Sequence, residues 1–145
     1  MLNSNLNSTP SSSLGAKAGE RRIVVVIENE DAIARTLQLL IEDWGFECIA
    51  GSSAALAARA LGADAARVCA VIADYQLDDG FTGDKAAAMI SLAAGAPIPT
   101  LLTTGHVTLA DRLAGYPVLP KPFDPEVLHR WLEDNVCRMS DLAQS

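Results

Sequence analysis

Two short apolar segments that each end on polar residues constrain this sequence most. The first is Ile23–Ile27, followed by Glu28 and Asn29, and the second is Cys69–Ala73, followed by Asp74. Continuous apolar runs of this length, rich in β-branched residues, are typical of parallel strands buried on both faces. Parallel strands bring the residues at their carboxyl ends to one edge of a sheet, where ligands of open α/β folds bind. We therefore expect Glu28, Asn29 and Asp74 to converge.

Two further apolar segments end on residues with polar side chains. The segment 100–103 leads into Thr104 and Gly105, and Val118–Pro120 leads into Lys121. The predicted edge thus carries an acid and an amide, a second acid, a hydroxyl and an ammonium group. Crowded carboxylates repel one another and need a cation, and ligands that are all oxygen atoms suit a hard divalent ion such as Mg²⁺.

Helical patterns fill the intervals between these strands. One helix is predicted from Glu30 or Asp31 to Trp44-Gly45, one from a cap at Ser52 or Ser53 to about Leu61 with Leu56 and Ala60 on one face, one over Gly83–Ala94, and one from Pro125 with Asp124 as its cap. Further strands are expected over 46–50 and 68–73. The alternation of strands and helices predicts an α/β domain whose parallel sheet has helices on both faces.

Composition limits the organisation of the chain. Its 145 residues suffice for one domain. Residues 1–22, rich in serine and asparagine, predict a disordered tail or linker, followed by a domain over 23–138 and a C-terminal tail over 139–145. The net charge of −7 argues against a nucleic-acid-binding surface. We expect no membrane span and no signal peptide, since the apolar stretches are too short and the N-terminus lacks an apolar core.

The three cysteines, Cys48, Cys69 and Cys137, are scattered through apolar contexts. Their spacing fits neither a zinc site nor a redox pair, so we expect buried free thiols. Free thiols are typical of a reducing compartment, which predicts a cytoplasmic location.

In this order and spacing, the four strand ends resemble those of the receiver domain of bacterial two-component response regulators. The resemblance covers roughly residues 22–138. It implies a flavodoxin-like fold, a three-layer, doubly wound, five-stranded parallel sheet with strand order 2-1-3-4-5. It also implies that Asp74 accepts a phosphoryl group from phosphohistidine and that Thr104 and Lys121 contact this group. Thr103 replaces Thr104 in this role if the register differs by one residue. Before phosphorylation, Lys121 would pair with Asp74 itself.

The resemblance implies Mg²⁺ as the cofactor. Glu28 would act through water, Asn29 and Asp74 would bind directly, and the backbone carbonyl of Gln76 would be a further ligand. Asn29 stands where the family has an aspartate, so we expect weaker Mg²⁺ binding, because hard cations favour charged oxygen ligands. Glu30 could compensate, although acids at positions 30 and 31 also suit the first turn of a helix.

Several other positions carry expectations from the same resemblance. The Lys121-Pro122 bond is expected to be cis, which proline makes accessible. His106 and Gln76, two residues past Thr104 and Asp74, are expected to flank the phosphoryl group. His129, by contrast, is interpreted as a surface or packing residue.

The sequence departs from the family between Thr104 and Lys121. These residues are 121 − 104 = 17 positions apart, which is about one helical turn short of the usual receiver. We therefore expect His106–Ala114 to form a shortened fourth helix. Val118 occupies the position of the usual switch aromatic, and Tyr116 is the nearest aromatic residue.

Three functions are compatible with these residues. The leading one is a phosphoacceptor receiver served by a histidine kinase or histidine phosphotransfer protein, standing alone or attached to a hybrid sensor kinase. It would signal through protein contacts, dimerisation among them, and catalyse only its own phosphorylation and dephosphorylation. The second is a pseudo-receiver that binds a partner without phosphorylation, favoured by Asn29 and Val118. The third, a Mg²⁺-dependent phosphohydrolase, needs a general acid two residues past Asp74, where Gln76 cannot serve.

Overall fold

The computed structural model describes residues 21–77, 80–105 and 115–144, with side chains as far as Val136. The strands are β2 (Ile23–Ile27), β3 (Glu47–Gly51), β4 (Val68–Asp74), β5 (Thr100–Thr104) and β6 (Val118–Pro120). The helices are α1 (Asp31–Asp43), α2 (Ala54–Leu61), the 3-10 helix η1 (Gly62–Arg67), α3 (Gly83–Ala94) and α5 (Pro125–Gln144). The predicted bounds differ from these by at most two residues, except at the end of α5, and η1 was not predicted. The helix predicted over His106–Ala114 lies outside the described residues.

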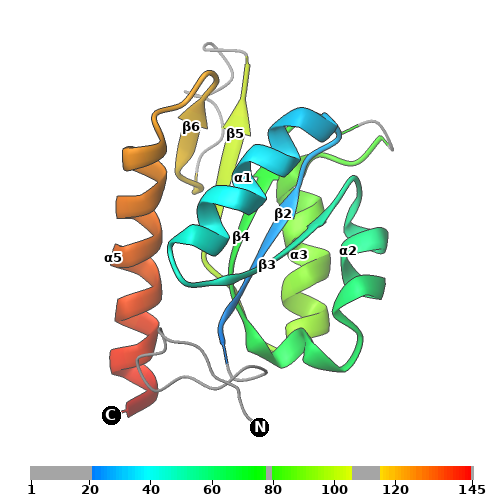
Figure 1. Cartoon of the computed structure of the whole chain (residues 1–145). Coiled ribbons are helices and arrows are strands. Elements are labelled where there is room, and N and C mark those ends of the chain that lie inside the picture. Colours follow the sequence, from blue (N-terminus) through cyan, green and yellow to red (C-terminus); the bar gives the residue numbers. More distant parts are fainter. Residues whose placement is uncertain (1–20, 78–79, 106–114, 145) are drawn as a thin grey trace, which may run out of the picture.

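The five strands form one parallel sheet in the order β3-β2-β4-β5-β6 (Figure 1). In chain order this is 2-1-3-4-5, which confirms the predicted flavodoxin-like topology. β2 and β4 lie side by side in the interior of the sheet, and every one of their residues is buried. An interior strand that is covered on both faces has no solvent-facing positions, and this explains why both sequences are continuous apolar runs.

Helices cover both faces of the sheet, which makes three layers (Figure 1). Successive strand residues point to opposite faces, so Val25 and Val71 pack in the cluster that includes residues of α2 and α3. Val24 and Ile72 pack in the second cluster, with residues of α1 and α5. The sheet edge formed by the strand ends therefore lies between two packed layers.

The inward face of α2 differs from the prediction. Ala54, Ala57 and Leu61 are buried, whereas Leu56 and Ala60 are exposed. Small residues face the sheet here, so the helix lies against it through alanine rather than through Leu56. A helix in which nearly every residue is apolar gives no clear periodic signal for its buried face.

The starts of α2 and α5 have the expected capping residues. Ser53, rather than Ser52, caps α2 by accepting a hydrogen bond from the backbone N–H of Leu56 at 3.2 Å. Asp124 accepts a hydrogen bond from the backbone N–H of Glu126 at 2.9 Å, ahead of α5.

α5 continues to Gln144, so residues 139–144, predicted as a tail, are helical. No glycine or proline follows Pro125 to end the helix earlier.

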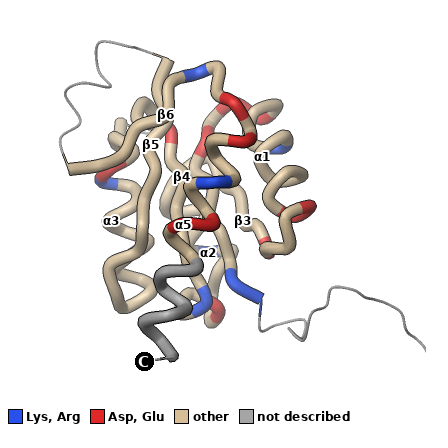
Figure 2. Tube along the Cα trace, turned by 90° about the vertical axis from the view of Figure 1, so that its left-hand side faces the viewer, with Lys and Arg blue, Asp and Glu red and all other residues tan. Residues whose placement is uncertain are grey.

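The surface of α3 is almost free of charge. Its charged residues, Asp84 and Lys85, both lie near its start, and the rest of the helix is uncharged (Figure 2). Leu92 on its outer side is 84% exposed. Among the described residues, no helix is both long and apolar enough to cross a membrane.

Two of the three cysteines are placed by the structure. Cys48 and Cys69 are buried and free, as predicted, and burial raises the pKa of each thiol to about 12. Cys137 lies beyond the described side chains.

Candidate functional site

The strand ends bring the predicted polar residues to one edge of the sheet. Ile27 of β2 pairs with Ala73 of β4, so Glu28 and Asp74 follow at the same level of neighbouring strands. On the other side, the ladder between β5 and β6 pairs Thr104 with Pro120, and Lys121 follows directly. The backbone N–H of Lys121 donates to the carbonyl oxygen of Thr104 at 2.8 Å. The expected convergence is therefore present for Glu28 and Asp74, with Thr104 and Lys121 at the same edge.

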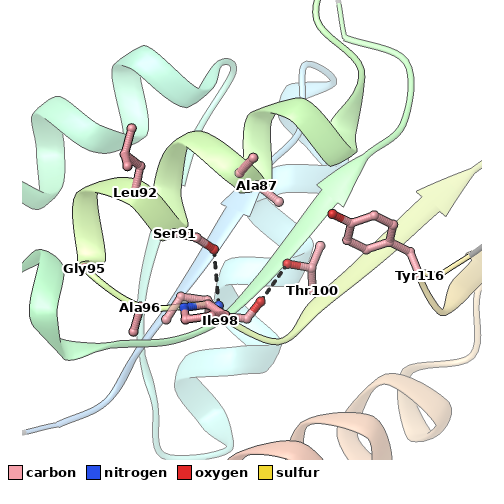
Figure 3. A pocket seen from close by; sticks show the side chains of 10 residues that line it. Ala87, Ser91, Leu92, Gly95, Ala96, Ile98, Thr100 and Tyr116 are labelled. Atoms are coloured by element: carbon pink, nitrogen blue, oxygen red, sulfur yellow. Dashed lines mark hydrogen bonds between the residues drawn. The ribbon is translucent and has the colours of Figure 1, made fainter.

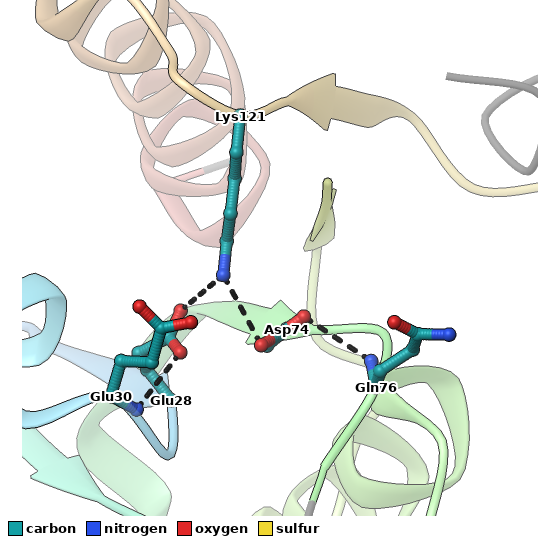
Figure 4. Close-up of polar contacts among 5 residues, drawn as sticks. All are labelled: Glu28, Glu30, Asp74, Gln76 and Lys121. Carbon is teal, nitrogen blue, oxygen red and sulfur yellow. Dashed lines mark hydrogen bonds and ion pairs between the residues drawn. The ribbon is translucent and has the colours of Figure 1, made fainter. Parts of the chain in front are cut away.

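Lys121 joins the two carboxylates of this edge (Figure 4). Its Nζ lies 3.0 Å from Oε1 of Glu28 and 3.2 Å from Oδ2 of Asp74. The side chains are 16% exposed for Lys121, 2% for Glu28 and 9% for Asp74. One ammonium thus neutralises part of the charge of two nearly buried acids. The sequence predicted the contact with Asp74, but not the shorter contact with Glu28.

Backbone N–H groups hold the remaining carboxylate oxygens. Oε2 of Glu28 accepts a hydrogen bond from the N–H of Glu30 at 3.1 Å, and Oδ1 of Asp74 accepts one from the N–H of Gln76 at 3.2 Å. Glu30 thus contributes its backbone N–H group to the site, while the residue itself is exposed. Each carboxylate is therefore oriented by one backbone donor and by the same lysine.

The pKa values at this edge reflect burial and charge together. Burial raises the pKa of Glu28, although hydrogen bonds from Lys121 and from the backbone of Glu30 oppose the rise. Burial alone would lower the pKa of Lys121, but its hydrogen bond to Glu28 and the negative charges of Glu28 and Asp74 outweigh this effect and raise it. Lys121 is therefore a charged ammonium at neutral pH.

The residues around Asn29 bear on whether Mg²⁺ suits this edge. Oδ1 of Asn29 is shielded from solvent and has no hydrogen-bond partner in the described part of the chain. Its oxygen atom and those of the Glu28 and Asp74 carboxylates are of the kind that Mg²⁺ prefers as ligands. Within that same part, no cluster of three or more His, Cys, Asp or Glu side chains has the arrangement of a metal site. The donor set fits Mg²⁺ chemically, with less negative charge than three acids would supply.

Two adjacent threonines lie at the end of β5. Thr103 and Thr104 are both buried, and consecutive strand residues point to opposite faces. Thr103 lies opposite Asp74 in the ladder, and its carbonyl oxygen accepts from the N–H of Tyr75 at 2.8 Å. Thr104 is the last strand residue and is joined to Lys121 through its carbonyl oxygen. Both stay candidates for the hydroxyl that contacts a phosphoryl group.

The outcomes differ for three further predictions. His106 lies outside the described residues. His129 packs on Trp44, with ring centroids 4.3 Å apart and planes inclined by 6°, so it is the packing residue that was predicted. The Lys121-Pro122 peptide bond is cis, as expected.

Tyr116 lies away from the carboxyl ends of the strands, where Asp74 and Thr104 are found. Val118 pairs with Leu102, which places Tyr116 beside the amino end of β5. Its ring lines a cavity of about 570 Å³ together with Ser91 of α3 and Thr100 (Figure 3). The nearest aromatic residue is therefore not positioned to respond to Thr104 directly.

A second cavity, of about 560 Å³, opens beside Lys121. It lies between α1 and the connection from β6 to α5, and its apolar walls include Ile33, Leu40 and Phe123. Ile33 and Leu40 are half-buried. An apolar groove thus adjoins the polar edge of the sheet, which we call the α1 groove.

Comparisons with known proteins agree with this architecture. No protein-family model and no curated protein matches the sequence. A response regulator receiver domain from Clostridium thermocellum superposes with a TM-score of 0.69 at 21% identity, over 83% of this chain and 98% of that one. The receiver domain of the hybrid histidine kinase CckA gives 0.65 at 20% identity, over 79% and 98%. The PhyR receiver domain of Erythrobacter litoralis gives 0.64 at 23% identity, over 82% and 92%. In topology and in the placement of its strand ends, the chain has the fold of response regulator receiver domains.

Proposed function

We propose that this chain is a phosphoacceptor receiver of a two-component phosphorelay. The observation that carries the proposal is the pairing of Asp74 with Lys121, Nζ to Oδ2 at 3.2 Å, at the carboxyl edge of a sheet with this fold. The acceptor is Asp74, and the donor is a phosphohistidine on a histidine kinase or histidine phosphotransfer protein. The chain catalyses its own phosphorylation and dephosphorylation and acts on no separate substrate.

The chemistry needs a positioned carboxylate more than a strong nucleophile. A carboxylate oxygen of Asp74 forms a bond to phosphorus while the bond between phosphorus and the imidazole nitrogen breaks, and the imidazole leaves with the electron pair. Catalysis of phosphoryl transfer rests largely on positioning and on neutralising charge. The N–H of Gln76 fixes Oδ1 of Asp74, and the ammonium of Lys121 neutralises developing charge. The hydroxyl of Thr104 donates to a phosphoryl oxygen.

Mg²⁺ is the proposed cofactor of this transfer. Glu28 through water, Asn29, Asp74 and the carbonyl oxygen of Gln76 are the residues that would hold it. When bound, it supplies positive charge to the phosphoryl oxygens. The contact of Lys121 with Glu28 at 3.0 Å competes for one of these carboxylates, so we expect the affinity to be modest.

The α1 groove supports docking of the phosphodonor protein. It opens beside Lys121 and presents Ile33, Leu40 and Phe123 to solvent as a partly apolar wall. Exposed apolar grooves beside a reactive group are typical of protein interaction sites. A donor seated there would bring its phosphohistidine to the edge that carries Asp74.

A phosphorylation-independent pseudo-receiver is the second candidate. The contact between Glu28 and Lys121 favours it, because the acids of the edge are already paired without any added cation. Asn29 in place of an acid favours it as well. In this case the α1 groove would bind a partner while Asp74 stays unmodified.

The deciding experiment is intact-mass spectrometry after incubation with acetyl phosphate, with and without MgCl₂. We expect one added phosphoryl group that depends on Mg²⁺ and is absent in Asp74→Asn. Asp43→Asn, at the exposed end of α1, is the matched control and should be phosphorylated like the wild type. Thr104→Ala should slow the reaction more than Thr103→Ala. An unmodified wild-type chain, or a modified Asp74→Asn chain, would favour the pseudo-receiver.

A further inference from the structure

Gly83, the first residue of α3, lies against the backbone of the acceptor. A methyl group in place of one Gly83 hydrogen would lie 2.5 Å from the carbonyl oxygen of Asp74, 2.9 Å from its carbonyl carbon and 3.1 Å from Cδ2 of Leu102. Carbon atoms in van der Waals contact are about 3.5–4.0 Å apart, so no side chain fits there. The backbone of Gly83 is outside the left-handed region. Close approach, rather than conformational freedom, is the reason for glycine at this position.

Hydrogen bonds tie Gly83 to the same short stretch of chain. Its N–H donates to the carbonyl oxygen of Tyr75 at 2.9 Å, and the N–H of Tyr75 donates to Thr103 at 2.8 Å. Thr82 and Gln76 form an antiparallel bridge just beside this contact. The start of α3, the residues that follow β4 and the end of β5 therefore form one tightly packed junction around the Asp74 peptide.

We propose that Gly83 is a positioning residue for phosphorylation at Asp74, an inference that rests on the proposed function. By having no side chain, it lets α3 pack directly on the carbonyl group of Asp74 and so sets where the acceptor carboxylate meets Lys121. Any Cβ at position 83 must push away backbone atoms, which cannot rotate aside as the end of a long side chain can. The displaced group is the residue that carries the reaction, with its carboxylate 3.2 Å from Lys121.

The test compares alanine at the two ends of the same helix. Gly83→Ala places a methyl group against Asp74. Gly95→Ala, at the C-cap of α3, meets nothing within 4 Å but forces a φ of +82° on alanine. Both variants strain the protein, and only the first strains it at the acceptor. Rates of phosphorylation by acetyl phosphate, urea unfolding curves and the amide NMR shift of Tyr75 would be measured on the full chain.

We expect Gly83→Ala to be phosphorylated about 10- to 100-fold more slowly, because moving a reactive group by about an ångström can lower a rate by this factor. Its Tyr75 amide resonance should shift. Gly95→Ala should keep a rate within about twofold of the wild type and an unshifted Tyr75 amide, because its methyl group meets nothing within 4 Å and lies at the opposite end of α3 from Gly83. If Gly83→Ala is too unstable to measure, the same measurements are made on it and on Gly95→Ala in a stabilising osmolyte such as trimethylamine N-oxide.

Two results would overturn the inference. The first is a Gly83→Ala variant whose phosphorylation rate and Tyr75 amide resonance both match those of the wild type. The second is a Gly95→Ala variant that loses as much rate as Gly83→Ala. If the wild-type chain accepts no phosphoryl group, the proposed function fails, and the Tyr75 shifts together with the separation of Asp74 and Lys121 in a crystal structure of Gly83→Ala decide on Gly83 alone.

Discussion

Lys121 and Glu28 are 93 positions apart in the sequence, yet the Lys121 ammonium lies closer to Glu28, at 3.0 Å, than to Asp74, at 3.2 Å. The Asp74 carboxylate therefore shares its only described cationic partner with a more deeply buried acid. Both acids depend on one lysine for charge compensation, and this dependence makes the edge sensitive to substitution, pH and added cations.

Lys121→Met should lower the free energy of unfolding by about 3 kcal/mol at pH 7, because it leaves two largely buried carboxylates without their cation. The deficit should shrink on acidification. Burial raises the pKa of the Glu28 carboxyl in the folded chain above 4.5, its value when exposed. The protonated carboxyl is neutral and needs no cation, so its contribution to stability is full below about pH 4.5 and is lost as pH rises through the folded pKa. Urea unfolding between pH 4.5 and 7 measures this.

Glu28→Gln/Lys121→Met is the control for that pH dependence. It lacks the titrating Glu28 carboxyl, so the stability difference between this double variant and Glu28→Gln should vary much less with pH. A Lys121→Met deficit that is constant over the range would contradict the role assigned to Glu28.

Asn29→Asp should strengthen Mg²⁺ binding. The new carboxylate adds negative charge beside Glu28 and Asp74, so the variant should be less stable than the wild type without Mg²⁺ and gain more stability with it. We expect the Mg²⁺ concentration at half-effect to fall about tenfold, equivalent to about 1.4 kcal/mol. Thermal unfolding over a MgCl₂ series at constant ionic strength provides the measurement. Ala60→Glu, an exposed charge on α2, should leave the Mg²⁺ response unchanged.

The stacked rings of Trp44 and His129 should couple α1 to α5. Rings at 4.3 Å with nearly parallel planes predict a coupling energy of about 1 kcal/mol in a double-mutant cycle of Trp44→Ala and His129→Ala. Denaturant unfolding of the four chains gives this value. His129 also lies 3.6 Å from Glu133, so a cycle of Trp44→Ala with Glu133→Ala is the control. An equal coupling in both cycles would show that the stack itself contributes nothing.

Cys48 and Cys69 should resist alkylation in the folded chain. With pKa values of about 12, on the order of one thiol in ten thousand is ionised at pH 8, and the thiolate is the reactive form. In a Cys137→Ser background, iodoacetamide should label neither residue natively and both in urea. Since each folded pKa lies above the exposed value of 9.0, the thiols favour folding below about pH 9 and lose this contribution as pH approaches 12. Rapid native labelling would contradict their burial.

The elements of the fold could be predicted because their signals are local. Ile23–Ile27 has the same bounds in the sequence pattern and in the structure, since every residue of an interior strand is buried and the strand is therefore a continuous apolar run. Helix caps are local signals as well, and Asp124 could be predicted as a cap from its place directly before Pro125. The inward face of α2 could not be predicted, because only Arg59 interrupts its apolar composition.

The site was predictable as a set of strand ends and not as a set of contacts. Which residues share the edge follows from topology, but the reach of the Lys121 side chain to Glu28 depends on how β6 lies relative to β2, with two strands between them. The closeness of Gly83 to Asp74 depends likewise on how α3 packs. The roles of Thr104, Asn29 and Gln76 stay predictions.

The interior position of β2 and β4 has a consequence for how the chain exchanges hydrogen with solvent. All residues of both strands are buried, and each strand has a hydrogen-bonded neighbour on either side. Their amides can exchange only when the whole sheet opens, so their protection factors report the global free energy of unfolding. The amides of β3 and β6, which lie at the two borders of the sheet, exchange through smaller local openings. Asp74 thus ends one of the two interior strands, while Lys121 follows a border strand, so we expect the two sides of the site to exchange hydrogen through different openings.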